Sequence, residues 1–422
     1  MIVFWLLLTF FFLDYVRPTS FFPALEILHL NSLVPLLMVI GTLARRKERK
    51  PIEGEPSNDA MIVALLGCIV LSAAVAPVTE RVFNTFTAVI GYAAVYWALT
   101  EQIDSVHRLK RVTQALLVVH LIVAMLSPLM FTDPDARHYL TAGGFLGDGN
   151  DYALSVNIVV PLCFFLMSQS ANSRQKALWA IALVVCIACI VLTKSRGGTL
   201  ALAVVGAYYW TKSEKKMRGV VLAGVIVGAI LLAAPALYFD RMSTMFQSQE
   251  GSTQGRLNAW AAGIQMAKDY PLTGIGAGHF GLLHGQTAHS IYFLVLGELG
   301  FPGLIVLITI ITRNLLANRR LFKQLADDPG AVMERRLLAA LSASMLAFAV
   351  GGAFLSAVYY PHLYVIAGLS TAARRLVHER SRSNALVEVR AAPVVIPNAI
   401  SAEWKAAKAA HLGLPHPSSS GK

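Results

Sequence analysis

Residues 177–210, ALWAIALVVCIACIVLTKSRGGTLALAVVGAYYW, consist of two apolar runs joined by a short polar turn. Neither run contains a charged residue, whereas the turn, Thr193–Thr199, carries Lys194, Arg196 and two glycines. A helix needs about 20 apolar residues to cross a bilayer. Lipid offers no partners for unpaired backbone groups, so such runs span a membrane as helices. This stretch therefore predicts a helical hairpin in a membrane.

The composition of the whole chain agrees with this prediction. Of the 422 residues, 56% are hydrophobic and 14% are charged. Soluble domains contain about 45–50% apolar and about 25% charged residues, so this chain could not cover a soluble surface. Disorder, a collagen-like repeat and a disulfide scaffold are excluded on the same grounds. We interpret the four cysteines as small apolar residues, because all lie in apolar runs: Cys68, Cys163, Cys186 and Cys189.

Apolar runs of spanning length recur along the chain and predict an all-α polytopic membrane protein with about 12 transmembrane helices. The first run lacks the basic flank and cleavage site of a signal peptide, so we expect it to be a span. The predicted spans are roughly 1–15, 24–43, 60–77, 83–100, 112–131, 152–169, 177–193, 199–211, 219–238, 290–312, 337–357 and 361–373.

The 36 lysines and arginines alternate between rich and sparse connections. Basic residues concentrate on the cytoplasmic side of membrane proteins, so the alternation predicts that both termini are cytoplasmic. The basic residues fall in short clusters between apolar runs, and no GxxxxGK or suitable GxGxxG motif is present, so no nucleic-acid or nucleotide partner is expected. The sparse, outer set holds only Arg17, Arg81, Arg137, Lys194, Arg196, Arg241, Arg256 and Lys268.

The domain organisation follows from these spans. We predict a transmembrane catalytic domain over 1–373 and a basic, largely disordered cytoplasmic tail over 374–422. The long outer segments are about 132–151 and 240–289, and the second lies between spans nine and ten. A catalytic site is therefore expected to face outward.

Two outer arginines occur in contexts that favour anion binding. Arg196 precedes Gly197-Gly198, and a guanidinium beside glycines matches the oxygens of a phosphate. The alternative is a tight hairpin whose basic residues reach lipid headgroups. Arg256 opens a predicted amphipathic helix that has Trp260 as an interfacial anchor. Its helix N-terminus also favours an anion, whereas the alternative places Arg256 in water.

Three histidines follow in the second outer segment. The spacing of His279, His284 and His289 does not place them on one helix face, which disfavours zinc. His289 differs because it opens a span, where a neutral imidazole can accept a proton near pH 7. The alternative is a capping histidine. Inside the spans, His120 and Glu298 are functional hypotheses by default, although Glu298 is better explained as a partner for a neighbouring helix.

Taken together, these motifs resemble the O-antigen ligase and polymerase superfamily. The matching stretches are TKSRGGT at Thr193–Thr199, the segment Gly255–Phe280 that ends in PLTGIGAGHF, and HSIYFLVLGELGFPG at His289–Gly303. Gly147–Tyr152, with Pro161, gives a weaker match to an Asn-containing motif at the start of a span. Ser290 departs from the pattern, because many members have Asn after the histidine.

The resemblance implies a GT-C-like, metal-independent, inverting glycosyltransferase of the inner membrane with no cofactor. It implies an undecaprenyl-pyrophosphate-linked glycan as donor and a sugar hydroxyl of lipid A–core as acceptor, at a periplasmic active site among membrane lipids. An O-antigen polymerase, a protein O-oligosaccharyltransferase and a polysaccharide transporter or flippase remain alternatives. The residues to which it assigns roles are His289 as base, Arg196 and Arg256 on the pyrophosphate, Lys194 as their helper, and Asn150 and Asp151 as lining of the substrate cavity.

Overall fold

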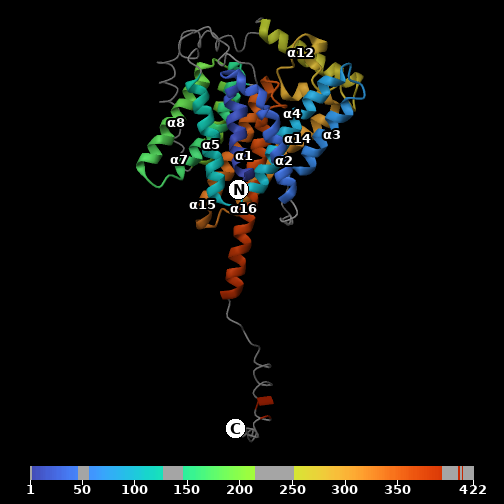
Figure 1. Ribbon diagram of the computed structural model, residues 1–422. Coiled ribbons are helices and arrows are strands. Elements are labelled where there is room, and N and C mark those ends of the chain that lie inside the picture. Colours follow the sequence, from blue (N-terminus) through green and yellow to red (C-terminus); the bar gives the residue numbers. More distant parts are fainter. Residues whose placement is uncertain are drawn as a thin grey trace. The chain divides into compact units, whose positions relative to one another are not determined.

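A computed structural model describes residues 2–45, 57–126, 146–213 and 251–391, together with 407–408 and 411. The regular elements in these ranges are all helices, as the apolar runs predict. The chain divides into two compact units, Met1–Leu376 and Val377–Lys422. The first unit contains every residue discussed below, and its helices form a bundle (Figure 1).

The helices overlap the predicted spans, although α14 and α16 continue well past the predicted ends at 312 and 373. Those before the second outer segment are α1 (Ile2–Phe11), α2 (Leu30–Arg45), α3 (Asp59–Ser72), α4 (Thr79–Gln102), α5 (Val106–Met125), α7 (Gly149–Ser168), α8 (Ser173–Leu192) and α9 (Arg196–Lys212). Those that follow are α12 (Gly251–Asp269), α13 (Phe280–His284), α14 (Ile291–Gln324), α15 (Val332–Gly351), the single 3-10 turn η7 (Gly352–Phe354) and α16 (Pro361–Ala391).

Every predicted span except 219–238 coincides with one of these helices, and 219–238 lies outside the described residues. Six helical segments in the described ranges are long and apolar enough to cross a membrane. The count of about 12 spans stays a prediction. α16 runs through the predicted domain boundary at 373 without a break, and the disorder of the tail is likewise untested. The chain is therefore a multi-pass membrane protein built from α-helices.

Local sequence explains where several helices begin. Ser105 accepts a hydrogen bond from the backbone N–H of Arg108 at the start of α5, and Asn172 does the same for Gln175 at the start of α8. Such caps satisfy backbone donors that have no partner within the helix. These two residues thus mark the starts of α5 and α8.

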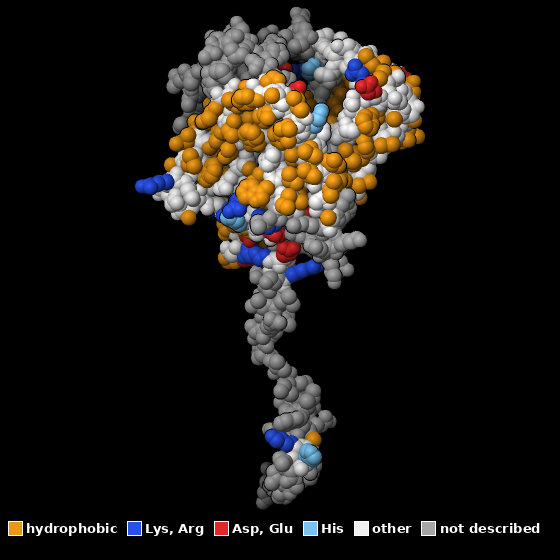
Figure 2. All heavy atoms as spheres, in the orientation of Figure 1, with side chains coloured by type: hydrophobic (Ala, Val, Ile, Leu, Met, Phe, Trp, Pro, Cys, Tyr) orange, Lys and Arg blue, Asp and Glu red, His pale blue; other side chains and the backbone are white. Residues whose placement is uncertain are grey.

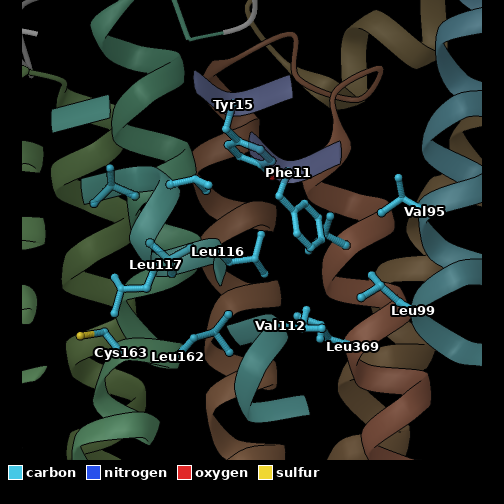
Figure 3. Close-up of a cluster of buried hydrophobic side chains, with 14 of the residues drawn as sticks. Phe11, Tyr15, Val95, Leu99, Val112, Leu116, Leu117, Leu162, Cys163 and Leu369 are labelled. Atoms are coloured by element: carbon cyan, nitrogen blue, oxygen red, sulfur yellow. The ribbon is translucent and has the colours of Figure 1, made fainter. Parts of the chain in front are cut away.

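The interior of the bundle consists of two clusters of buried apolar side chains. One joins α1, α5, α7 and α8 and includes Phe11, Leu116 and Leu162, which Figure 3 shows packed together. The other joins α3, α12 and α14 through residues such as Leu65, Ala259 and Val295. Helices α4, α7, α15 and α16 contribute to both clusters and so connect them.

The outer surface of the bundle is also apolar over much of its height. Figure 2 shows hydrophobic side chains across this face, with charged side chains gathered toward its two ends. Leu36, Ile40 and Phe83 are among the exposed aliphatic and aromatic residues. A soluble protein would not expose a patch of this extent, whereas a membrane-embedded one must.

A break in α14 allows the loop after α12 to bond to this helix. Gly300 has a left-handed backbone (φ 67°), and Pro302 lacks an N–H group. In an unbroken helix the N–H groups of residues 301 and 302 would donate to the carbonyls of residues 297 and 298. The N–H of Phe301 donates instead to the carbonyl of Pro271, 3.0 Å away. The carbonyls of Gly297 and Glu298 are thus released from the ladder.

The glycine-rich loop after α12 uses both released carbonyls. The N–H of Ile275 donates to Gly297 at 2.9 Å, and that of Gly276 donates to Glu298 at 3.1 Å. Gly274 directly precedes Ile275 in this loop and has φ +63°. A Cβ added to it would collide with the backbone of Glu298. Only glycine accommodates both the left-handed conformation and this close approach.

The carboxylate of Glu298 completes the joint. Its two oxygens accept backbone hydrogen bonds from Gly278 (2.9 Å) and Phe280 (2.8 Å), and Oε2 also accepts from the Tyr359 hydroxyl at 2.9 Å. Glu298 is 2% exposed. The sequence-based interpretation of Glu298 as a structural partner is therefore confirmed. It ties the loop, α14 and the segment before α16 together.

Replacing Gly274 tests whether this joint stabilises the fold. Gly274→Ala is expected to lower the midpoint of thermal unfolding strongly, because the added Cβ both strains the backbone and displaces the loop from α14. The matched control is Gly285→Ala, at φ +83° with open space around the added Cβ. The control carries only the conformational penalty, about 1–2 kcal/mol. Unfolding of the purified protein in detergent gives both midpoints, and equal losses would show that the close contact is unimportant.

Candidate functional site

Helices α12 and α14 run side by side in the same direction. The rings of Trp260 and Phe293 are stacked with centroids 5.0 Å apart. One and a half turns earlier on α12, the carbonyl of Gly255 accepts a hydrogen bond from Gln286 at 2.8 Å. The two segments are therefore in parallel register, with an offset that places the start of α12 beside the residues that precede α14. Arg256, next to Gly255, is brought to the same end as His289.

His289 lies between two short anchors at the start of α14. Its backbone N–H donates to Ser356 Oγ at 3.0 Å, and the hydroxyl of Thr287 donates to the same oxygen at 2.5 Å. His289 has a left-handed backbone, with φ 50°. A non-glycine residue in this region is uncommon and indicates that its surroundings fix the conformation. The imidazole is partly buried.

Arg196 reaches this end of the bundle from another direction. It is the first residue of α9, whose cap is the Ser195 hydroxyl, which accepts from the N–H of Gly198 at 3.1 Å. A Cβ added at Gly197 would lie 3.1 Å from Phe354 Cβ. A Cβ added at Gly352, at the other end of η7, would lie 2.7 Å from Ile291.

The segment 352–356 therefore separates the start of α9 from the start of α14 by the width of one chain. It contacts Gly197 on one side, next to Arg196, and it holds the backbone of His289 on the other. Two predicted site residues that are 93 positions apart in sequence are thus placed on either side of the same short connection.

The first turn of α7 adds acidic and amide groups to this end. Asp148 caps the helix, since its Oδ1 accepts from the backbone N–H of Asn150 at 2.7 Å and from the Asn150 side chain at 2.9 Å. About two turns further along, Asn157 donates to the carbonyl of Gly198 at 3.0 Å and joins α7 to the start of α9. The first half of α7 therefore packs against the start of α9, and Asn150 and Asp151 precede this contact by about two turns.

Charges from two of these elements act on His289. Partial burial lowers the pKa of its imidazole from the ordinary 6.5, and the positive charge of Arg256 lowers it further. The negative charge of Asp148 opposes both effects and raises the pKa. The carboxylates of Asp151 and Asp148 also act on Tyr360, whose pKa is raised chiefly by burial. Arg256, Asp148 and His289 thus share one electrostatic environment.

Lys194 is placed in the same turn as Arg196 but differs from it. Its residue is 8% exposed and its backbone is left-handed, with φ 52°. Its N–H donates to the carbonyl of Val191 at 2.9 Å and ends α8. The turn between α8 and α9 is therefore a tight, buried reversal in which a basic side chain is retained despite burial.

Four helix N-termini meet at this end: those of α7, α9, α12 and α14. The contacts described above connect this end of the four helices, from Asn157 to Gly198, from Gly197 to Phe354, from Ser356 to His289, and from Gly255 to Gln286. Each N-terminus carries a partial positive charge and unpaired N–H groups. Together with Arg196 and Arg256 they make this region suitable for an anion. Figure 2 shows a hollow near the lobe that contains α12, where basic, acidic and histidine side chains gather.

The other polar residues found in the sequence are used elsewhere. His279 accepts from the N–H of Val78 at Nε2 and donates through Nδ1 to the carbonyl of Ala277, 3.1 and 3.0 Å away, so both ring nitrogens are occupied. His120 pairs with Ser155 at 2.7 Å inside the bundle. Among the described residues, no group of three histidine, cysteine or acidic side chains lies in a position to hold a metal ion.

Sequence reasoning did not assign roles to Ser356, Asp148 or Tyr360. Ser356 lies at the edge of an apolar run and carries no local signal, because its partner Thr287 is 69 residues away. Asp148 did have a signal: an acidic residue two positions before Asn150 is typical of a helix cap. Tyr360 resembles any aromatic residue at a membrane interface, so only its neighbours in space distinguish it.

Comparison with known proteins concerns a segment that includes three of the predicted site residues. The family described as O-antigen ligase matches residues 181–308. No curated protein matches the chain. The matched segment contains Arg196, Arg256 and His289, from the second half of α8 through most of the membrane-spanning part of α14. Residues 181–308 of this chain are therefore similar to a family of O-antigen ligases.

Proposed function

We propose that this protein is an O-antigen ligase that transfers a glycan from undecaprenyl pyrophosphate to a sugar hydroxyl of lipid A–core. The family supports a lipid-linked glycan as substrate. The observation that carries the proposal is the segment 352–356, which contacts both His289 and Gly197, next to Arg196, while the charge of Arg256 acts on His289. The site faces the periplasm in this proposal, as the distribution of basic residues predicts.

The arginines account for the leaving group. When the glycosidic bond breaks, negative charge grows on a lipid pyrophosphate. Arg196 and Arg256 approach from α9 and α12, so one guanidinium stands on each side of the diphosphate, and each can donate two parallel hydrogen bonds. Fixed donors placed where charge develops stabilise the transition state more than the ground state. Lys194 adds a third positive charge from the same turn.

His289 accounts for the nucleophile. A sugar hydroxyl must lose its proton as it attacks, and the neutral imidazole accepts it. The nearby Arg256 keeps His289 neutral by lowering its pKa, while Asp148 limits that effect and preserves the basicity of the imidazole. Attack on the face opposite the pyrophosphate inverts the anomeric centre. Asn150 and Asp151, in the first turn of α7, line the cavity for the sugars in this proposal.

Alanine substitutions test the three assigned roles. His289→Ala is expected to reduce glycan transfer by about 100- to 10,000-fold, the range for loss of a general base. Arg196→Ala and Arg256→Ala are each expected to reduce it by about 100-fold or more, through loss of transition-state stabilisation. Transfer is measured as gel-shifted lipid A–core after incubation of purified protein with the lipid-linked donor.

Matched controls keep folding and chemistry apart. Lys268→Ala removes an exposed basic residue at the far end of α12, and His284→Ala removes the histidine that ends α13. Both are expected to retain activity within about twofold, and all five variants to keep the wild-type unfolding midpoint. A fully active Arg196→Ala, Arg256→Ala or His289→Ala protein would remove that residue from the mechanism.

The electrostatics of His289 predict the pH dependence. A general base works when neutral, so activity is present above its pKa and declines as the pH falls through it. Because the pKa of His289 is lowered from 6.5, the acid limb of kcat/KM should lie below pH 6.5. Asp148→Asn keeps a helix cap but removes the charge that raises this pKa, so the limb should move to lower pH. Asp269→Asn, at the end of α12, is the control. A limb that moves to higher pH in Asp148→Asn would contradict this assignment.

The product separates a ligase from its relatives. With purified donor and lipid A–core, a ligase yields glycan on lipid A–core, whereas a polymerase yields a longer lipid-linked glycan. The proposed mechanism places arginines where a metal would otherwise hold the pyrophosphate, so transfer should persist in EDTA. Loss of transfer in EDTA that is restored by a divalent metal would refute the metal-independent mechanism.

A further inference from the structure

A second polar site lies at the other end of the bundle. A cavity of about 260 Å³ is enclosed by α2, the start of α3, α4 and α16. Arg313 of α14 shows where the cavity lies along the bundle. Its side chain donates at 3.1 Å to the carbonyl of Ser57, and Ser57 lines the cavity. Arg313 follows His289 by roughly 35 Å of helix rise. The cavity is thus separate from the site around His289.

The cavity presents a carboxylate in a fixed orientation. Asp59 Oδ1 accepts from Trp97 Nε1 at 3.0 Å, and Oδ2 accepts from the Ser57 hydroxyl at 3.1 Å. Each carboxylate oxygen has room for a second donor. All three residues line the cavity, as does a second acid, Glu101. The acidic wall is therefore built to receive a further N–H donor.

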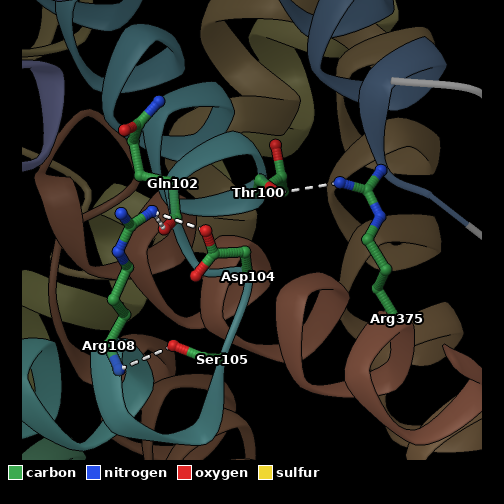
Figure 4. A network of polar contacts seen from close by, with 6 residues as sticks. All are labelled: Thr100, Gln102, Asp104, Ser105, Arg108 and Arg375. Atoms are coloured by element: carbon green, nitrogen blue, oxygen red, sulfur yellow. Dashed lines mark hydrogen bonds and ion pairs between the residues drawn. The ribbon is translucent and has the colours of Figure 1, made fainter. Parts of the chain in front are cut away.

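A basic residue also lines the cavity. Arg375 lines the cavity from α16 and donates to the carbonyl of Thr100 at 2.8 Å, as Figure 4 shows. The buried Arg374 beside it donates to Asn314 and Asn318, at 3.1 and 2.9 Å, and Arg313 lies behind Ser57. Acidic and basic side chains in the lining of one cavity suit a zwitterion.

One buried hydroxyl on this surface has no partner within the described ranges. Thr42 is 5% exposed, lines the cavity, and its Oγ1 makes no hydrogen bond to any described residue. A buried, unpaired hydroxyl is costly, by about 1–3 kcal/mol. A ligand that offers an acceptor or donor here would satisfy it.

The mouth of the cavity faces the aliphatic surface of the bundle. Ile90, which lines it, is 37% exposed, and Leu36 and Ile40 on α2 are 55% and 56% exposed. These side chains lie on the surface that we expect to contact acyl chains. A ligand that enters between α2 and α4 therefore needs an apolar part outside and a zwitterionic part within.

We propose that this cavity binds the phosphoethanolamine headgroup of a membrane phospholipid. The primary ammonium group donates to Asp59 and Glu101, the phosphate lies toward Arg375 and the Thr42 hydroxyl, and the acyl chains leave past Ile90. A volume of 260 Å³ is below the range of about 300–1,000 Å³ for whole drug-sized ligands, which suits a headgroup alone. This site is independent of the proposed transfer reaction.

Lipid retention tests the proposal. The full-length protein is placed in nanodiscs of equal parts phosphatidylethanolamine and phosphatidylglycerol, and native mass spectrometry measures which lipid stays bound. Phosphatidylglycerol has the phosphate but no ammonium group. The wild type should retain phosphatidylethanolamine in preference, and Asp59→Asn should lower that preference by about tenfold, the effect of losing one charge-assisted hydrogen bond. Equal retention of the two lipids by the wild type would overturn the proposal.

The matched control is Asp104→Asn. Asp104 is also an acid near this end and pairs with Arg108 at 2.7 Å (Figure 4). It is not among the residues that line the cavity. Its substitution should leave lipid preference unchanged. If Asp104→Asn lowers the preference for phosphatidylethanolamine as much as Asp59→Asn does, the loss is caused by surface charge. The cavity is then not the binding site.

A second variant guards against a simple folding effect. Thr42→Val keeps the shape of the side chain but removes the unpaired hydroxyl. In delipidated protein it should raise the unfolding midpoint, and in nanodiscs it should lower retention of phosphatidylethanolamine. Free O-phosphoethanolamine at the same concentration should not displace the lipid, because it lacks the acyl chains. Full displacement, or unchanged retention in Thr42→Val, would refute a lipid headgroup site.

Discussion

The half of this protein that contains the candidate site depends on an interruption in one helix. Gly300 and Pro302 interrupt α14, and the carbonyls of Gly297 and Glu298 then accept hydrogen bonds from the loop that follows α12. In a bilayer such released groups must find partners within the protein. The loop supplies them, and the Glu298 carboxylate fastens it. This joint fixes the parallel register of α12 and α14, and through that register it brings Arg256 beside His289.

The site that results is made of helix beginnings rather than of helix faces. Arg196 and Asp148 stand at the start of α9 and α7, and His289 stands two residues before α14. A helix start offers a partial positive charge and backbone N–H groups that have no partner within the helix. Side chains placed there are held by caps and by tertiary contacts, so the site combines access from outside with a rigid base in the bundle.

Much of this arrangement could be predicted from the sequence. Apolar length located the helices, and the turn around Arg196 and the start of the span at His289 were visible as polar interruptions. The pairing of Glu298 with Gly278 and Phe280 was not predictable, because it depends on the three-dimensional fold of the loop. The glycines of this loop permit many backbone conformations and do not indicate which one forms. Ser356 was equally hidden, since a lone serine in an apolar run has no pattern. The cavity at Asp59 depends on the packing of α2, α4 and α16, which no local signal encodes.

The left-handed backbone at His289 and Lys194 has a consequence for how this protein tolerates genetic change. At both positions the chain must satisfy a strained torsion as well as supply a particular side chain. Replacements that preserve chemistry but carry a branched Cβ meet a steric barrier, and those best suited to the torsion, glycine and asparagine, lack the ring or the charge. Substitution at these two positions is therefore restricted both by the backbone torsion and by the required side chain. The exposed aliphatic residues on the lipid-facing surface have neither restriction and can replace one another.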